Sequence, residues 1–173
     1  MNTHHTLSSV VTLAAAMALA AMPAAAQVSE LQVLASGTVQ TNCLVTLQSG
    51  CTISATGTMT SPTLAPGTFA LRVDTGSPAS FNGNPTGEGQ GLCFPGSFRM
   101  TVTENGGDTI TFRHTGTVCE EATPGSPYQY HGAYRIDGGT GRFVTAGGGG
   151  SLAATFTRGE TPTVYVYLHG TMQ

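Results

Sequence analysis

The chain has 173 residues, 24 of them glycine, and carries a formal net charge of −3 at pH 7 with only 9% charged residues. All six basic residues are arginines, and they are spread along the chain without a basic cluster. Nucleic acids and anionic membranes attract cationic surfaces, so both classes of partner are excluded. Glycine, serine and threonine between alternating apolar residues indicate a folded domain of short strands and tight turns.

The N-terminus predicts a secretory signal peptide over residues 1–26. Val10–Ala21 is an apolar run too short to span a bilayer as a helix, and Ala24–Ala26 provides a small-residue cleavage site. No lysine or arginine precedes the apolar run, which departs from the usual pattern, and a buried helix is the competing interpretation. We expect cleavage near Ala26, a secreted or periplasmic location, no membrane span, and a single β-barrel domain over residues 27–173.

Strand candidates then follow one another with no convincing helix between them. Each is an alternating apolar and polar run bounded by turn-forming residues, and the longer loops are Thr75–Gly91 and Glu120–Tyr130. The predicted strands are Leu31–Gln40, Leu44–Gln48, Thr52–Met59, Phe69–Asp74, Phe98–Glu104, Thr109–Thr115, His131–Asp137, Arg142–Ala146, Ser151–Thr157 and Thr163–His169. They predict an all-β fold: an antiparallel β-barrel of about eight strands, whose closure removes sheet edges, or a β-sandwich.

Two of these strands form a hairpin whose register can be predicted. Asn105–Gly107 is a three-residue turn of the kind that joins antiparallel strands. When Val102 is placed opposite Ile110, Thr101 faces Thr111. Apolar side chains then share one face and threonines share the other, as cross-strand pairing favours.

Four cysteines in a secreted chain indicate two disulfides, and three pairings are open. The hairpin register places Cys93 opposite Cys119, within disulfide reach if the ladder continues past Pro95. Cys43 and Cys51 bracket a short turn, so we predict Cys43–Cys51 and Cys93–Cys119. A metal site is the competing interpretation, but CxxC spacing and a nearby Cys/His cluster are missing, so we expect no metal.

The segment Tyr134–Phe156 contains two short strands and two glycine clusters. Asp137–Gly141 supplies the positive-φ positions of a tight turn, and Gly147–Gly150 indicates a second bend or a backbone pressed against another element. A phosphate-binding loop competes with this interpretation. It lacks the third glycine of a dinucleotide site, a following helix and the lysine of a Walker loop, so we expect no cofactor.

The run Tyr134–Phe143 contains Gly-Gly-Thr-Gly-Arg-Phe and is followed by a glycine cluster and a Thr/Ala-rich strand. It resembles the corresponding segment of dirigent and allene oxide cyclase-like proteins, over residues 134–156 only. The resemblance implies an eight-stranded antiparallel barrel with an apolar ligand cavity. Some members of the family cyclise or orient reactive small molecules, and others have no known activity. Gly138, Gly139 and Gly141 match as structural turn residues, and no catalytic residue is carried over.

One cross-strand pair of the hairpin is unfavourable by charge, because Arg99 faces Arg113. Like charges in such a pair need a negative group between them or full solvation. A bound anion or carboxylate ligand is one interpretation. We favour the other, a local carboxylate such as Glu120 or Glu121, or simple solvation.

The last predicted strand has one aliphatic face and one face of rings. Val164, Val166 and Leu168 form the first, and Tyr165, Tyr167 and His169 form the second. Inside a barrel the rings would offer stacking and hydrogen bonds to a small ligand. Because aliphatic side chains make the more natural interior, we expect the rings outside, where the resemblance implies assembly into a homo-oligomer.

The groups that serve acid–base catalysis are scattered along the chain. His114, His131 and His169 form no triad or Cys/His set by spacing, and His114 falls in an apolar row as a packed strand residue. Glu104 and Asp108 straddle the hairpin turn, where we expect both to be solvated.

We therefore expect a secreted small β-barrel protein that binds a small apolar molecule or has a non-catalytic envelope role. The alternative is a cofactor-independent cyclase or dirigent-type enzyme acting on a small hydrophobic substrate, with barrel walls orienting the reactants. A cavity lined by tyrosine or histidine would favour ligand binding, and an interior filled by small side chains would favour the structural role. The candidate ligand-binding residues are Arg99, Arg113, Tyr165, Tyr167 and His169.

Overall fold

The computed structural model describes residues 27–42, 48–76, 93–120 and 125–173. They form eight strands and one short 3₁₀ helix. These elements are β1 (Ser29–Thr41), β2 (Thr52–Thr60), β3 (Gly67–Thr75), β4 (Cys93–Glu104), β5 (Thr109–Glu120), β6 (Tyr128–Gly139), η2 (Gly141–Phe143), β7 (Gly148–Phe156) and β8 (Thr163–Met172). The predicted signal peptide, Cys43 and nearly all of the predicted strand Leu44–Gln48 lie outside the described residues.

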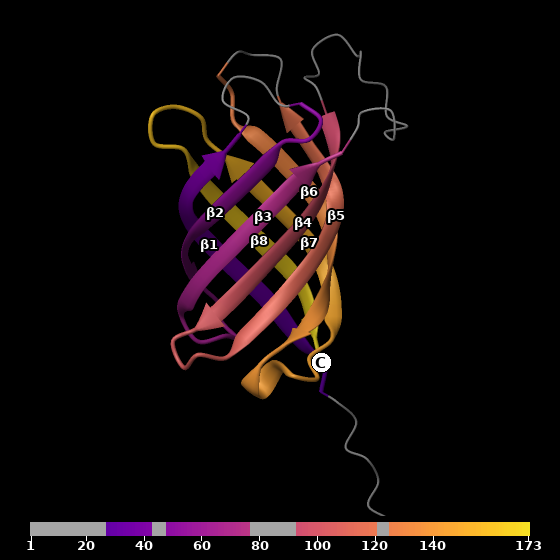
Figure 1. Ribbon diagram of the computed structural model, residues 1–173. Coiled ribbons are helices and arrows are strands. Elements are labelled where there is room, and N and C mark those ends of the chain that lie inside the picture. Colours follow the sequence, from indigo (N-terminus) through magenta and orange to yellow (C-terminus); the bar gives the residue numbers. More distant parts are fainter. Residues whose placement is uncertain (1–26, 43–47, 77–92, 121–124) are drawn as a thin grey trace, which may run out of the picture.

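The strands form a closed antiparallel barrel in which each strand pairs with the next and β8 returns to pair with β1 (Figure 1). The register of that last pair runs from Ser29 opposite Met172 to Thr38 opposite Thr163. This confirms the barrel and excludes the sandwich. Closure pairs the backbone groups that an open sheet would leave exposed at its two edges.

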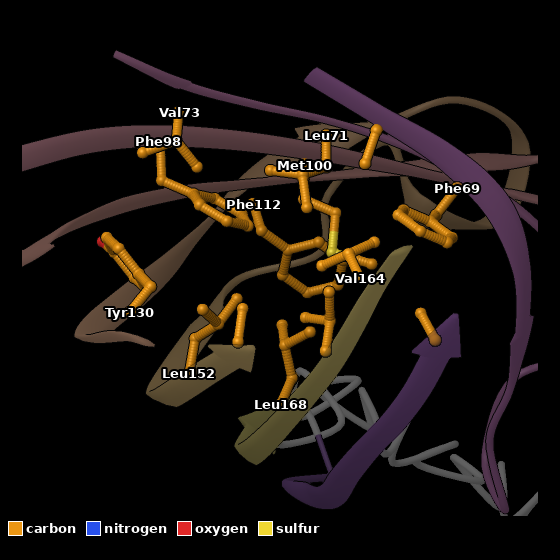
Figure 2. Close-up of a cluster of buried hydrophobic side chains, with 14 of the residues drawn as sticks. Phe69, Leu71, Val73, Phe98, Met100, Phe112, Tyr130, Leu152, Val164 and Leu168 are labelled. Carbon is orange, nitrogen blue, oxygen red and sulfur yellow. The ribbon is translucent and has the colours of Figure 1, made fainter. Parts of the chain in front are cut away.

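Alternation along each strand separates a packed lumen from a polar exterior. On β8, Val164, Val166 and Leu168 are buried, whereas Tyr165 and Tyr167 are exposed. The prediction that the rings lie outside is therefore confirmed for the two tyrosines and for His169, which is also exposed. Figure 2 shows the lumen filled by aromatic and aliphatic side chains that come from several strands around the barrel.

The β4–β5 hairpin has the predicted register from its turn to its disulfide. Val102 lies opposite Ile110, and the ladder continues through Pro95 to Cys93 opposite Cys119. The two cysteines are joined by the predicted disulfide, with their Cα atoms 4.0 Å apart. The predicted Cys43–Cys51 pairing stays a prediction, because Cys43 lies outside the described residues.

Three inward glycines make room for one buried ring. Gly96, Gly116 and Gly132 are direct cross-strand neighbours on β4, β5 and β6. A Cβ atom at Gly116 or at Gly132 would lie 2.7 Å from the hydroxyl oxygen of Tyr130. The glycines therefore provide the space that the Tyr130 side chain occupies in the lumen.

The predicted strand Arg142–Ala146 is wrong, since the chain forms η2 and a turn there. Gly141 has φ +55°, and a Cβ atom on it would meet Asp108 Oδ1 at 1.8 Å. Phe143 is buried, and its burial on a single helical turn produces no strand alternation. The apparent alternation of this segment arose from one buried ring between exposed neighbours.

The expectation that Glu104 is solvated is also wrong. Its side chain is buried and accepts hydrogen bonds from the backbone amide of Ala65 at 2.7 Å and from Arg142 Nε at 3.0 Å. Arg142 also lies over the Phe143 ring. The carboxylate thus joins the β2–β3 connection to η2 at one end of the barrel, which gives Arg142 and Phe143 a structural role.

Candidate functional site

The arginines of β3 to β6 form a single row across the outside of the barrel. Arg72, Arg99, Arg113 and Arg135 are direct cross-strand partners in that order, and we call them the arginine row. Beside it lies a second outward row of smaller side chains, which we call the hydroxyl row: Asp74, Ser97, Thr115 and Ala133. Together the two rows line a hollow of about 630 Å³.

Two carboxylates pair with three of the four arginines. Arg72 Nε donates to Asp74 at 2.8 Å and lowers the pKa of this carboxyl, and Arg113 donates to Asp137. Arg135 lies 3.9 Å from the same Asp137. Within the described residues Arg99 has no carboxylate partner.

Of the two carboxylates predicted to balance Arg99 and Arg113, only Glu120 lies in the described residues, and it does not pair with either arginine. Glu120 instead forms an ion pair with Arg158, and Glu121 lies outside the described residues. Asp137 was missed as the partner of Arg113 because no short turn specifies the register of β5 against β6.

A second hollow, of about 400 Å³, lies on the opposite half of the exterior over β7, β8, β1 and β2. Its large side chains are Leu34, Tyr165 and Tyr167, which are 59%, 60% and 42% exposed. Its other side chains are small, among them Ser36 and Ala153. We call this surface the tyrosine groove, and it is the largest gathering of exposed apolar side chains in the described residues.

His169 lies beside the tyrosine groove but does not line it. Its ring stacks on Tyr167 with the centroids 6.3 Å apart, and its Nε2 is 3.2 Å from Glu30 Oε1. The structure therefore brings Tyr165 and Tyr167 together with His169 at the border, and places Arg99 and Arg113 on the other half of the barrel.

Inside the lumen, a cluster of buried rings contains polar atoms without partners. Both ring nitrogens of His114 and the hydroxyl groups of Tyr128, Tyr130 and Tyr134 make no hydrogen bond to any described residue. Burial lowers the pKa of His114 to about 3 and raises the pKa of Tyr134 to about 12. Phe98 meets the His114 ring edge to face, with the centroids 4.5 Å apart. His114 is thus a neutral, packed residue in the folded protein at pH 7.

Three further residues of the two outer surfaces were not singled out from the sequence. Arg72 and Arg135 join the arginine row through strands whose register depends on long connections, and only the β4–β5 turn is short enough to predict. Leu34 reaches Tyr167 through the pairing of β1 with β8, at opposite ends of the chain. Nothing local in the sequence indicates that these residues are neighbours.

In the described ranges, no group of three or more histidine, cysteine, aspartate or glutamate side chains is arranged to hold a metal ion. The same ranges contain no helix of the length and apolarity that crossing a bilayer requires. Comparison of the chain with protein-family models, with curated proteins and with solved structures finds no match in any of the three. The chemistry of the two outer surfaces and of the lumen is therefore the basis for assigning a function.

Proposed function

We propose that this protein is a secreted, non-catalytic barrel that binds a small apolar molecule in the tyrosine groove. The observation that carries the proposal is the hollow formed by Leu34, Tyr165 and Tyr167 around smaller side chains. Its volume of about 400 Å³ falls within the size range of small-molecule sites. Tyrosine rings supply apolar contact area and keep a hydroxyl group at the water boundary.

The packing of the lumen supports an outer site. Phe69, Phe112 and Leu168 are among the many side chains that fill the interior (Figure 2). Leu34, Tyr165 and Tyr167 stay 59%, 60% and 42% exposed in the folded protein, although burial of apolar surface is favourable by roughly 25 cal/mol per Å². A ligand in the groove would remove part of this apolar surface from water.

Binding of the neutral dye N-phenyl-1-naphthylamine, followed by fluorescence, tests the proposal. We expect saturable binding that weakens at least tenfold in the double variant Tyr165→Ser/Tyr167→Ser, because two ring faces are lost. Val144→Ser is the matched control, since Val144 is exposed but lies outside the groove. Its affinity should equal that of the unchanged protein.

Two results would overturn the proposal. If the double variant binds the dye as tightly as the unchanged protein, the ligand does not occupy the groove. If sedimentation shows a dimer that the double variant abolishes, a second copy of the chain is the occupant. Native mass spectrometry of protein purified from its own host would then show no retained small molecule.

The cofactor-independent cyclase is the second candidate, and the buried polar atoms of His114, Tyr130 and Tyr134 favour it. A substrate that displaced part of the packing in the lumen would provide the hydrogen-bond partners that these atoms lack. Dye binding that is weakened by Tyr130→Phe and unaffected by the groove variants would favour this candidate over the groove.

A further inference from the structure

We propose that the arginine row and the hydroxyl row together bind an acidic oligosaccharide, a short chain of uronic acid units. This site lies on β3 to β6, on the other half of the barrel from the tyrosine groove, and it is independent of the apolar ligand proposed above.

The spacing of the arginine row suits a ligand with repeated acidic groups. Arg72, Arg99, Arg113 and Arg135 stand on four consecutive strands in direct register. Neighbouring strands are about 4.8 Å apart, so the row spans roughly 14 Å across the sheet. A single small anion would contact one or two of these side chains and leave the others unused.

The excess positive charge of the row favours binding of a dianion or polyanion. Asp74 and Asp137 are its carboxylate partners, so four guanidinium groups share two carboxylates in the described structure. Directly opposed like charges destabilise a sheet. Four of the chain's six arginines gather here although its net charge is −3. Arginine presents a planar fork that matches a carboxylate with two parallel hydrogen bonds.

The hydroxyl row indicates a sugar rather than a bare anion. Ser97 and Thr115 are exposed cross-strand partners beside the arginines, and each hydroxyl both donates and accepts hydrogen bonds. Asp74 stays ionised next to Arg72 and accepts hydrogen bonds from it and from Thr52. Because Ala133 is also small, the row leaves room for the body of a ligand within the hollow of about 630 Å³.

Titration calorimetry with trigalacturonate tests the site, and maltotriose serves as the neutral sugar of equal length. We expect binding of the uronate, no binding of maltotriose, and an affinity that falls as sodium chloride rises from 50 to 500 mM, by roughly tenfold or more because exposed charges are screened. Arg99→Gln should lower the affinity for trigalacturonate at least tenfold, because it removes a charge-assisted contact.

Two matched variants separate the sugar from general charge. Gln40→Glu makes the same change in net charge on β1, outside the hollow, and should leave the affinity unchanged. Thr115→Val keeps the shape of the side chain but removes its hydroxyl. It should therefore lower the affinity for trigalacturonate and leave the affinity for inorganic triphosphate unchanged.

The opposite results overturn the proposal. If triphosphate binds as tightly as the uronate and Thr115→Val affects neither ligand, the surface is an anion patch without sugar recognition. If Gln40→Glu weakens binding as much as Arg99→Gln does, the attraction is nonspecific. If trigalacturonate does not bind at low salt, the proposed site is excluded.

Discussion

Arg99 on β4 lies directly opposite Arg113 on β5, and of the two only Arg113 has a carboxylate partner within the described residues, Asp137. Arg72 faces Arg99 from the other side and is itself paired with Asp74. Arg99 is therefore one of the two inner cations of the row and its least compensated member, which gives its replacement a distinctive effect on stability.

Replacing Arg99 with glutamine should stabilise the free protein at low ionic strength. The substitution relieves two like-charge contacts, worth about 0.2–1 kcal/mol together. Urea unfolding at 20 mM and 500 mM sodium chloride measures the effect, and the gain should shrink at high salt because the repulsion is already screened. Arg113→Gln should gain less, since it also removes the partner of Asp137. A loss of stability for Arg99→Gln at low salt would contradict the charge argument.

His114 should make folding stability depend on pH. Its pKa is lowered to about 3 in the folded protein, whereas an unfolded histidine titrates near its ordinary value of about 6.5. The unfolded state therefore binds more protons between these values. Stability from this group is fully present above pH 6.5 and falls by up to about 1.4 kcal/mol per pH unit as the pH drops toward 3.

Urea unfolding of the unchanged protein and of His114→Phe between pH 4.5 and 7.5 measures this contribution. It is the difference between the two proteins in the slope of the unfolding free energy against pH. The phenyl ring retains the packing against Phe98 but does not titrate. Equal slopes for the unchanged protein and His114→Phe would show that His114 is not the group responsible.

Gly141 should be intolerant of a side chain. It adopts φ +55°, and a Cβ atom there would lie 1.8 Å from Asp108 Oδ1, so we expect Gly141→Ala to lose about 1–3 kcal/mol. Gly106 is the matched control, because a Cβ atom on it meets nothing within 4 Å and its φ is not positive. Thermal unfolding should show a lower midpoint for Gly141→Ala and little change for Gly106→Ala. Equal midpoints would remove the steric argument.

Tyr130→Phe should not destabilise the protein. The hydroxyl group of Tyr130 is buried and has no hydrogen-bond partner in the described residues, so its removal relieves an unfavourable burial worth about 1–3 kcal/mol at most. Chemical denaturation should give equal or greater stability than that of the unchanged protein. A loss of more than about 1 kcal/mol would indicate a hydrogen bond to bound water or to a ligand in the lumen.

The barrel and one hairpin could be predicted from the sequence because they depend on local information. The turn at Asn105–Gly107 sets the register of β4 and β5, and this places Cys93 opposite Cys119 and Arg99 opposite Arg113. The inward and outward faces of β8 could also be predicted, since alternation along one strand needs no partner.

The rest depends on contacts between distant segments. Arg72 and Arg135 join the arginine row through pairings that no short turn specifies, and Leu34 meets Tyr167 only when the two ends of the chain come together. Glu104 appeared solvated because it precedes a turn, yet Arg142 reaches it from beyond β6. Local patterns identify which residues face outward, whereas the closed sheet determines which of them are neighbours.

The pairing of β1 with β8 also has a consequence for biosynthesis. The ladder joins Ser29 to Met172, so β1 has no second partner until β8 has left the ribosome. Strand pairing between such distant segments is slow to form. A nascent chain cut short within β8 would expose two open sheet edges, and these edges would favour association with other unfinished chains. Synthesis of β8 is therefore the step that allows the barrel to close.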